Sequence, residues 1–290
     1  MARGRTLSPL QVLVARPFHL GENPLWDERR GILFWEDIPG KSLHRWRADG
    51  ETSEVLCEGF TTGGFTLQKN GDLLLFREKD IALLPGGEPG EPVVLQPWED
   101  PGSTRFNDVI ADPMGRVFAG TIGRTDTSGG LFLMHTDGRI QEVLRGTGCS
   151  NGMGFSPDGQ TFYWTCSTRR QISAFAYEAA SGKLRDERVI YKAGPGDGIP
   201  DGLTIDRNGD LWSARFSSGE IIRLTADGRE CCRYPLPCRN ITSLCFAGPE
   251  RDWLAVTTAG LGREPEPAGY LFRLATHTSG PPEFRSRIQT

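Results

Sequence analysis

The chain alternates between short apolar runs and turns that contain polar residues and a glycine. One turn phrase, which leads directly into an apolar run, occurs in six copies: DERRGILFW from Asp27, KNGDLLLF from Lys69, DPMGRVFAG from Asp112, SPDGQTFYW from Ser156, DRNGDLWSA from Asp206 and the degenerate GPERDWLAV from Gly248. Successive copies start 42, 43, 44, 50 and 42 residues apart. Spacing of this size predicts a chain built from repeats of one structural unit.

A second set of alternating runs lies between these copies. They read KSLHRWRADG, DIALLPGG, GGLFLMHTDG, RQISAFAYEAASG, GEIIRLTADG and AGYLFRLATH. Most of them run into a turn, as the strands of a hairpin do, and no stretch longer than ten residues combines helical periodicity with helix caps. Each repeat therefore offers about four short strands, which predicts an all-β, six-bladed β-propeller with about four antiparallel strands per blade.

The length of 290 residues would also suit two domains. Two β-sandwich domains are the alternative, because their strands recur at a similar spacing. No linker-like segment interrupts the repeat, and the 37 glycines suit many tight turns. We therefore expect a single propeller domain over residues 1–290, in which residues 1–17 form an N-terminal extension or a closing strand.

The net charge of −4 is spread along the chain without a long run of one sign, and no basic patch typical of nucleic-acid binders is visible. No segment approaches the roughly 18 apolar residues of a membrane helix. The apolar stretch near the start is short and is interrupted by Pro9 and Pro17, unlike a secretory signal. We expect a soluble cytoplasmic protein with no nucleic-acid or membrane partner.

The seven cysteines are odd in number and contain no CxxC pair, which indicates structural thiols in a reducing compartment. The four histidines include no HExxH motif. Any metal should therefore be held mainly by oxygen ligands.

The repeat also places polar residues in register. The residue five positions before each turn phrase is, in order, Glu22, Gly64, Asn107, Asn151, Asp201 and Ser243. Equivalent positions of successive blades are related by rotation about the central channel, so these six residues should form one ring on the innermost strands. Two carboxylates and two amides are a ligand set for a hard divalent cation, calcium first, with zinc, magnesium or manganese as alternatives. The simpler interpretation is that they are turn-capping Asn and Asp residues, which explains any one of them but explains four in matching register poorly.

Four segments carry a family resemblance: GENPLW (21–26), STRFND (103–108), SNGMGFSPDG (150–159) and PDGLTIDRNGDLW (200–212). They resemble, in the same order, the signature segments of the SMP-30/gluconolactonase/LRE-like family, and the match extends from Leu20 to about Leu274. The resemblance implies a six-bladed propeller with one catalytic divalent metal in its channel. It also implies metal ligands at Glu22, Asn151 and Asp201, and substrate-facing roles for Arg105 and Asn107. Arg105 comes from the resemblance alone.

The chain departs from the family pattern in three places. It has Val109 where members commonly have glycine after Asn-Asp, and it has Cys166 near a position that is usually acidic. The segment IGRTDTSGG (122–130), where members often place a substrate-contacting loop, has no clear counterpart. The resemblance therefore defines the metal site better than the substrate.

We expect a metal-dependent lactonase, a carboxylic ester hydrolase that acts on a small-molecule lactone, with sugar-acid lactones as the first choice of substrate. The cation would polarise the lactone carbonyl, Asp201 would activate the attacking water, and Arg105 would orient the substrate. The alternatives are a related hydrolase of organophosphates or aryl esters and a non-catalytic metal-binding scaffold. GCSNG (148–152) matches a serine nucleophile elbow, but a strand phrase follows it where that elbow needs a helix, so we do not expect Ser150 to be a nucleophile.

Overall fold

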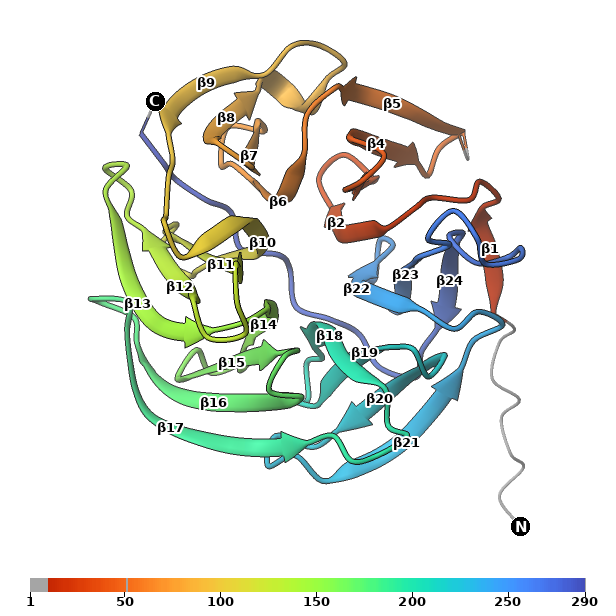
Figure 1. The fold of residues 1–290 in the computed structure, drawn as a ribbon. Helices are drawn as coiled ribbons and strands as arrows, with labels where there is room; N and C mark the ends of the chain where they lie inside the picture. Colours follow the sequence, from red (N-terminus) through yellow and green to blue (C-terminus); the bar gives the residue numbers. More distant parts are fainter. Residues whose placement is uncertain (1–9, 51, 290) are drawn as a thin grey trace.

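A computed structural model describes residues 10–50 and 52–289 of the chain. The described residues form 24 β-strands and one short 3-10 helix, η1 (Pro85–Gly87). The strands make six four-stranded antiparallel sheets, arranged in a ring about a central axis (Figure 1). The predicted fold class, an all-β six-bladed propeller with four strands per blade, is confirmed.

Each blade is numbered here in chain order, and its strands are given from the channel outward. Blade 1 consists of β2 (Gly21–Asp27), β3 (Ile32–Asp37), β4 (Ser42–Arg47) and β5 (Thr52–Glu58). Blade 2 consists of β6 (Thr62–Leu67), β7 (Leu73–Arg77), β8 (Asp80–Leu84) and β9 (Val93–Pro97). Blade 3 consists of β10 (Ser103–Ala111), β11 (Val117–Gly123), β12 (Gly129–Met134) and β13 (Ile140–Thr147).

Blade 4 consists of β14 (Ser150–Phe155), β15 (Thr161–Cys166), β16 (Gln171–Glu178) and β17 (Lys183–Lys192). Blade 5 consists of β18 (Ile199–Ile205), β19 (Leu211–Phe216), β20 (Glu220–Leu224) and β21 (Glu230–Pro235). Blade 6 consists of β22 (Ile241–Ala247), β23 (Trp253–Thr258), β24 (Leu271–Ala275) and β1 (Gln11–Val14).

The apolar cores lie between neighbouring blades. Phe34 and Leu43 of blade 1, for example, share one buried cluster with Phe65 and Leu75 of blade 2. A sheet that is packed on both faces buries consecutive residues, and all six residues of β3 are buried. This explains why the turn phrases lead into continuous apolar runs rather than into strict alternation.

The innermost strands β2, β6, β10, β14, β18 and β22 contact one another in a closed circle and form the wall of the channel. We call the side on which they begin the upper side and the side on which they end the lower side. In the part of the chain that the structure describes, no helix has the length and apolar character needed to cross a bilayer.

The ring is closed by a strand from the start of the chain. β1 pairs antiparallel with β24, with Gln11 opposite Arg273, so it supplies the outermost strand of blade 6. Residues 1–9 of the predicted N-terminal segment 1–17 lie outside the described residues. The single-domain assignment of residues 1–290 stays a prediction.

The C-terminal tail, residues 276–289, was not anticipated from the sequence. It runs from blade 6 across the centre of the ring (Figure 1). Its backbone bonds to blades on opposite sides: Ser279 O accepts from Arg207 N, Ser286 N donates to Leu67 O, and Arg287 N donates to Gly115 O. The tail therefore ties separate blades together at the lower side.

Candidate active site in the central channel

Each innermost strand has an irregularity in its pairing at the same level. In β2, Glu22 pairs with Glu36 but the next pair is Leu25 with Phe34, so the strand has one extra residue. The other five innermost strands show register shifts at the corresponding level. A β-bulge bends the strand and redirects a side chain, and here six bulges act around one channel.

The residues predicted to form a ring all lie on these innermost strands. Glu22, Asn107, Asn151, Asp201 and Ser243 are each only 5–6% exposed. The position in blade 2 is Gly64, which supplies no side chain.

The two ring carboxyl groups, Glu22 and Asp201, have raised pKa values, although the charge of Arg105 acts to lower that of Asp201. Burial raises the pKa of Glu22 well above its usual range, and the charge of Asp201 raises it further. Burial also raises the pKa of Asp201 strongly, although a hydrogen bond from Asn151 opposes this. Asp201 Oδ1 is buried and has no hydrogen-bond partner among the described residues. A buried carboxylate oxygen without a partner indicates that the site is completed by another group.

The two ring amides contact each other and Arg105. Arg105 Nη1 donates to Asn107 Oδ1 at 2.8 Å, and Asn107 Nδ2 donates to Asn151 Oδ1 at 3.2 Å. The structure thus brings together Arg105, Asn107 and Asn151, which the sequence analysis selected by two different routes.

Most of the chain is similar to proteins of one known family. The sequence model of the SMP-30/Gluconolactonase/LRE-like region matches residues 20–260. The chain belongs to this family. It is 39% identical to pentonolactonase XacC of Haloferax volcanii, over 93% of this chain and 95% of that protein. It is 32% identical to regucalcin of Gallus gallus, over 89% of this chain and 91% of that protein.

Two solved structures are similar in fold. One is a calcium-binding protein, regucalcin, from Agrobacterium tumefaciens, with a TM-score of 0.89 and 25% identity over 96% of this chain and 97% of that chain. The other is a luciferin-regenerating enzyme, with a TM-score of 0.88 and 22% identity over 97% of this chain and 99% of that chain. The resemblance proposed from the four signature segments is therefore confirmed at the level of the family.

Two further carboxyl groups of this family member lie near the ring and were missed by the sequence reasoning. Asp108 follows Asn107 within the bulge and is 8% exposed. Burial raises its pKa to about 7, against the opposing charge of Arg105. Glu36 pairs with Glu22 across β2 and β3, and neither of its carboxylate oxygens has a hydrogen-bond partner among the described residues. Burial raises the pKa of Glu36 to about 8.

Some signal for these residues was present. Asp108 closes the segment STRFND that carried the family resemblance, but strand alternation assigns neighbouring residues to opposite faces. Only the bulge brings Asp108 into the same region as the ring. Glu36 lies in FWEDIPG, and no property of that segment alone places it beside Glu22.

Cys149 lies beside the two amides. Its Sγ is 3.7 Å from Asn151 Nδ2 and 3.9 Å from Asn107 Nδ2. Burial raises the pKa of this thiol to about 12, so it stays protonated. Ser150 is fully buried and its Oγ accepts a hydrogen bond from Trp164 Nε1 at 2.6 Å. This agrees with the prediction that Ser150 is not a nucleophile.

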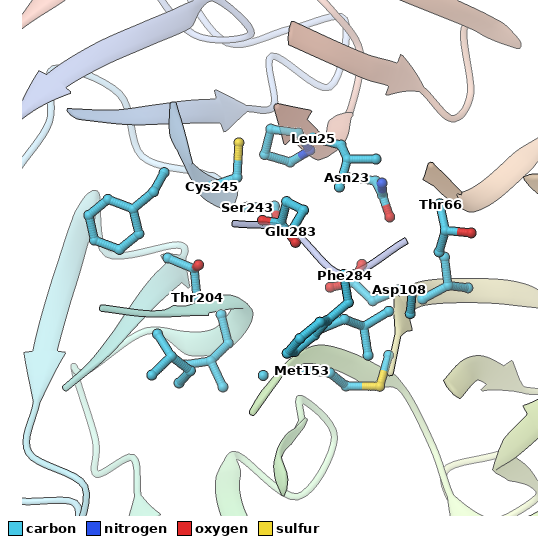
Figure 2. Close-up of a pocket in the computed structure, with 18 of the residues that line it drawn as sticks. Asn23, Leu25, Thr66, Asp108, Met153, Thr204, Ser243, Cys245, Glu283 and Phe284 are labelled. Carbon is cyan, nitrogen blue, oxygen red and sulfur yellow. The ribbon is translucent and has the colours of Figure 1, made fainter. Parts of the chain in front are cut away.

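A cavity of about 100 Å³ lies below the ring, between the innermost strands and the tail. Figure 2 labels side chains that line it: Asn23, Leu25, Thr66, Asp108, Met153, Thr204, Ser243, Cys245, Glu283 and Phe284. The tail contributes Pro281–Phe284 to the lining.

The donor set of the ring fits a divalent cation. It combines buried carboxylates with raised pKa values, an unpartnered Asp201 oxygen and amide carbonyls. Among the described residues, no three His, Cys, Asp or Glu side chains gather closely enough to hold a metal ion by themselves. An ion in the ring would therefore need an asparagine oxygen as well.

Proposed function

We propose that the chain is a divalent-metal-dependent hydrolase that opens a sugar-acid lactone, a gluconolactonase-like activity. The observation that carries the proposal is Asp201 Oδ1, which has no hydrogen-bond partner among the described residues and lies in a buried ring of acids and amides that also holds Arg105. The family match and the 39% identity to a protein named pentonolactonase support a lactone as substrate.

Glu22, Asn151 and Asp201 would hold the cation. When bound, the cation supplies Lewis-acid polarisation of the lactone carbonyl. Calcium suits an all-oxygen set, with zinc, magnesium or manganese as alternatives, and the relatives named regucalcin include one described as calcium-binding.

Asp201 acts as the general base. One of its two carboxylate oxygens would contact the cation, and the other accepts a proton from a water molecule while the water oxygen attacks the carbonyl carbon. The ring C–O bond then breaks, the proton passes to the departing oxygen, and the product is the open hydroxy acid. Loss of the proton restores the Asp201 carboxylate for the next cycle.

Arg105 and Asn107 face the substrate. Arg105 uses Nη1 to hold Asn107 Oδ1 and Phe106 O, both at 2.8 Å. Its other guanidinium nitrogens have no hydrogen-bond partner given by the described residues and can donate to hydroxyl groups or to a carboxylate.

We also propose a cytoplasmic location, since all seven cysteines are free thiols, as expected in a reducing compartment.

The test is a proton-release assay over a panel of sugar-acid lactones, with aryl esters and an organophosphate as competing substrates. Chelator-treated protein should lose lactone hydrolysis and regain it when a divalent cation is added. Hydrolysis that is indifferent to chelation would contradict the metal-dependent mechanism. Hydrolysis of the aryl esters or the organophosphate alone would replace the lactonase assignment with the related hydrolase.

A further inference from the structure

A continuous series of hydrogen bonds connects three blades at the level of the ring. Each group donates to the next: Arg105 Nη1 to Asn107 Oδ1 at 2.8 Å, Asn107 Nδ2 to Asn151 Oδ1 at 3.2 Å, Asn151 Nδ2 to Ser167 Oγ at 2.9 Å, and Ser167 Oγ to Pro200 O at 2.6 Å. We call these five residues the rim chain. It starts in blade 3, passes through blade 4 and ends in blade 5, at the residue before Asp201.

The direction of the rim chain is fixed at both ends. The guanidinium of Arg105 can only donate, and the carbonyl of Pro200 can only accept. Asn107 must therefore present its oxygen to Arg105 and its amino group to Asn151, and Asn151 must present its amino group to Ser167. Amide orientations are ordinarily ambiguous by 180°, but here the fixed ends determine both.

This polarity has a consequence for the site. It turns Asn151 Oδ1 away from Ser167, toward Asn107, and leaves that oxygen a second lone pair. The Oδ1 of Asn107, in contrast, is already engaged by the charged donor Arg105. Each ring amide oxygen accepts one hydrogen bond, but the donor to Asn107 is a charged guanidinium and the donor to Asn151 is a neutral amide, so the Asn151 oxygen is the better acceptor for a cation.

Ser167 is the link that joins two proposed metal ligands across a blade boundary. Its hydroxyl accepts from the Asn151 side chain and donates to the backbone directly before Asp201. Its own position is held by a backbone bond from Ser167 N to Cys149 O at 3.0 Å. Ser167 follows β15 in a loop and lies outside the repeated positions, so the register argument did not select it.

We propose that Ser167 is a positioning residue of this site, which fixes the Asn151 amide and aligns it with the strand that carries Asp201. The proposal rests on the proposed function in so far as it takes Asn151 and Asp201 as cation ligands. Groups that orient metal ligands typically change metal affinity or activity by about 10- to 100-fold when removed.

Ser217 provides a matched control. It follows β19 as Ser167 follows β15, and both residues are partly buried. Within the described residues, the Ser217 hydroxyl makes no hydrogen bond to the ring, and only its backbone oxygen accepts a bond, from Arg239 Nε.

The experiment uses the full chain and three variants, Ser167→Ala, Ser167→Thr and Ser217→Ala. After chelation, Mn²⁺ affinity is measured by calorimetry, followed by kcat and KM on a lactone and by the unfolding temperature. We expect Ser167→Ala to weaken Mn²⁺ binding by about 10- to 100-fold and to lower kcat more than it changes KM. Ser167→Thr, which keeps the hydroxyl, should recover most of the affinity, and Ser217→Ala should match the wild type.

Equal Mn²⁺ affinity of Ser167→Ala and Ser217→Ala would overturn the proposal, and so would a wild-type protein that does not bind Mn²⁺. A loss of affinity that merely follows a loss of folded protein, seen in the unfolding temperature and not rescued by threonine, would also overturn it. A wild type that binds Mn²⁺ but hydrolyses no lactone would remove the proposed function, while the Mn²⁺ comparison would still decide the role of Ser167.

Discussion

Four blades of the propeller have a carboxyl or amide residue at the ring position and two blades do not, although the backbone is irregular at this position in all six. Blades 1, 3, 4 and 5 direct Glu22, Asn107, Asn151 and Asp201 toward the ring, whereas blades 2 and 6 have Gly64 and Ser243. All six innermost strands nevertheless have a register shift at this level. The repeat therefore gives all six innermost strands the same irregularity, and the residue type at that position decides which blades contribute to a site.

Close approach of neighbouring strands explains part of this choice. A Cβ at Gly63 would lie 2.0 Å from Phe106 O, and a Cβ at Gly64 would lie 2.9 Å from Asn107 O. These are backbone atoms that cannot move aside easily, so blade 2 has room only for glycine where β6 meets β10. The two glycines of β6 therefore allow β10, the strand that carries Asn107, to pack closely against β6.

Among substitutions at the ring position, Asp201→Asn should cause the largest loss of kcat. The variant keeps the shape of the side chain but removes the proposed base, so we expect kcat on a lactone to fall by about 10²- to 10⁴-fold. Steady-state kinetics with saturating divalent cation measures this, and circular dichroism checks that the fold is retained. Turnover at the wild-type rate would exclude Asp201 as the base.

Ser243→Ala is the control from the other kind of blade. It lies at the equivalent position of blade 6, and its hydroxyl gives no hydrogen bond to Glu22, Asn107, Asn151 or Asp201 within the described residues. Its kcat should stay within about twofold of the wild type, because the substitution removes no hydrogen bond to the four polar ring residues.

A smaller effect is expected for Arg105→Ala. Loss of a hydrogen bond to a charged group costs about 1.5–3 kcal/mol, or about 10- to 100-fold, in substrate binding. We expect KM to rise by this factor while calorimetric Mn²⁺ affinity changes less. Unchanged KM, or a larger loss of Mn²⁺ than of substrate, would contradict a substrate-facing role.

The raised pKa values of Asp108 and Glu36 should make the stability of the metal-free protein depend on pH. Burial raises the pKa of Asp108 to about 7 and of Glu36 to about 8. The folded state therefore keeps protons that the unfolded chain releases, and the free energy of unfolding should decrease as pH rises from about 4 to about 8. The slope is at most about 1.4 kcal/mol per pH unit for each group.

Urea unfolding of chelator-treated protein across this pH range measures the slope. Glu36→Gln should flatten its upper part, because the amide cannot ionise, and a divalent cation should raise stability most at high pH. A stability that increases with pH through this range would contradict the assigned shifts.

Much of the fold could be predicted from the sequence because each repeat is marked by the polar and glycine residues of one recurring type of turn. Six copies of one phrase at nearly constant spacing give the blade number, and counting back five residues reaches every innermost strand. Two of the residues selected by this count, Asn107 and Asn151, are hydrogen-bonded to each other in the structure. The roles of these residues stay predictions.

The remainder depends on local departures from regular structure. Asp108 lies near the ring because a bulge interrupts the alternation of β10, and Ser167 reaches Asn151 from a loop. The tail has no strand pattern, and its place is set by backbone bonds to other blades, such as Arg287 N to Gly115 O. Periodicity cannot show contacts that arise where periodicity stops.

The pairing of β1 with β24 joins two strands that are synthesised at different times. Gln11 leaves the ribosome long before Arg273, its partner, has been made. Blades 1 to 5 are complete in the chain segment from β2 to β21, whereas blade 6 lacks its outer strand until the two ends of the ring meet. Non-local pairing of this kind is slow. The circle can therefore close only after β24 has been made, when the first described strand pairs with the last.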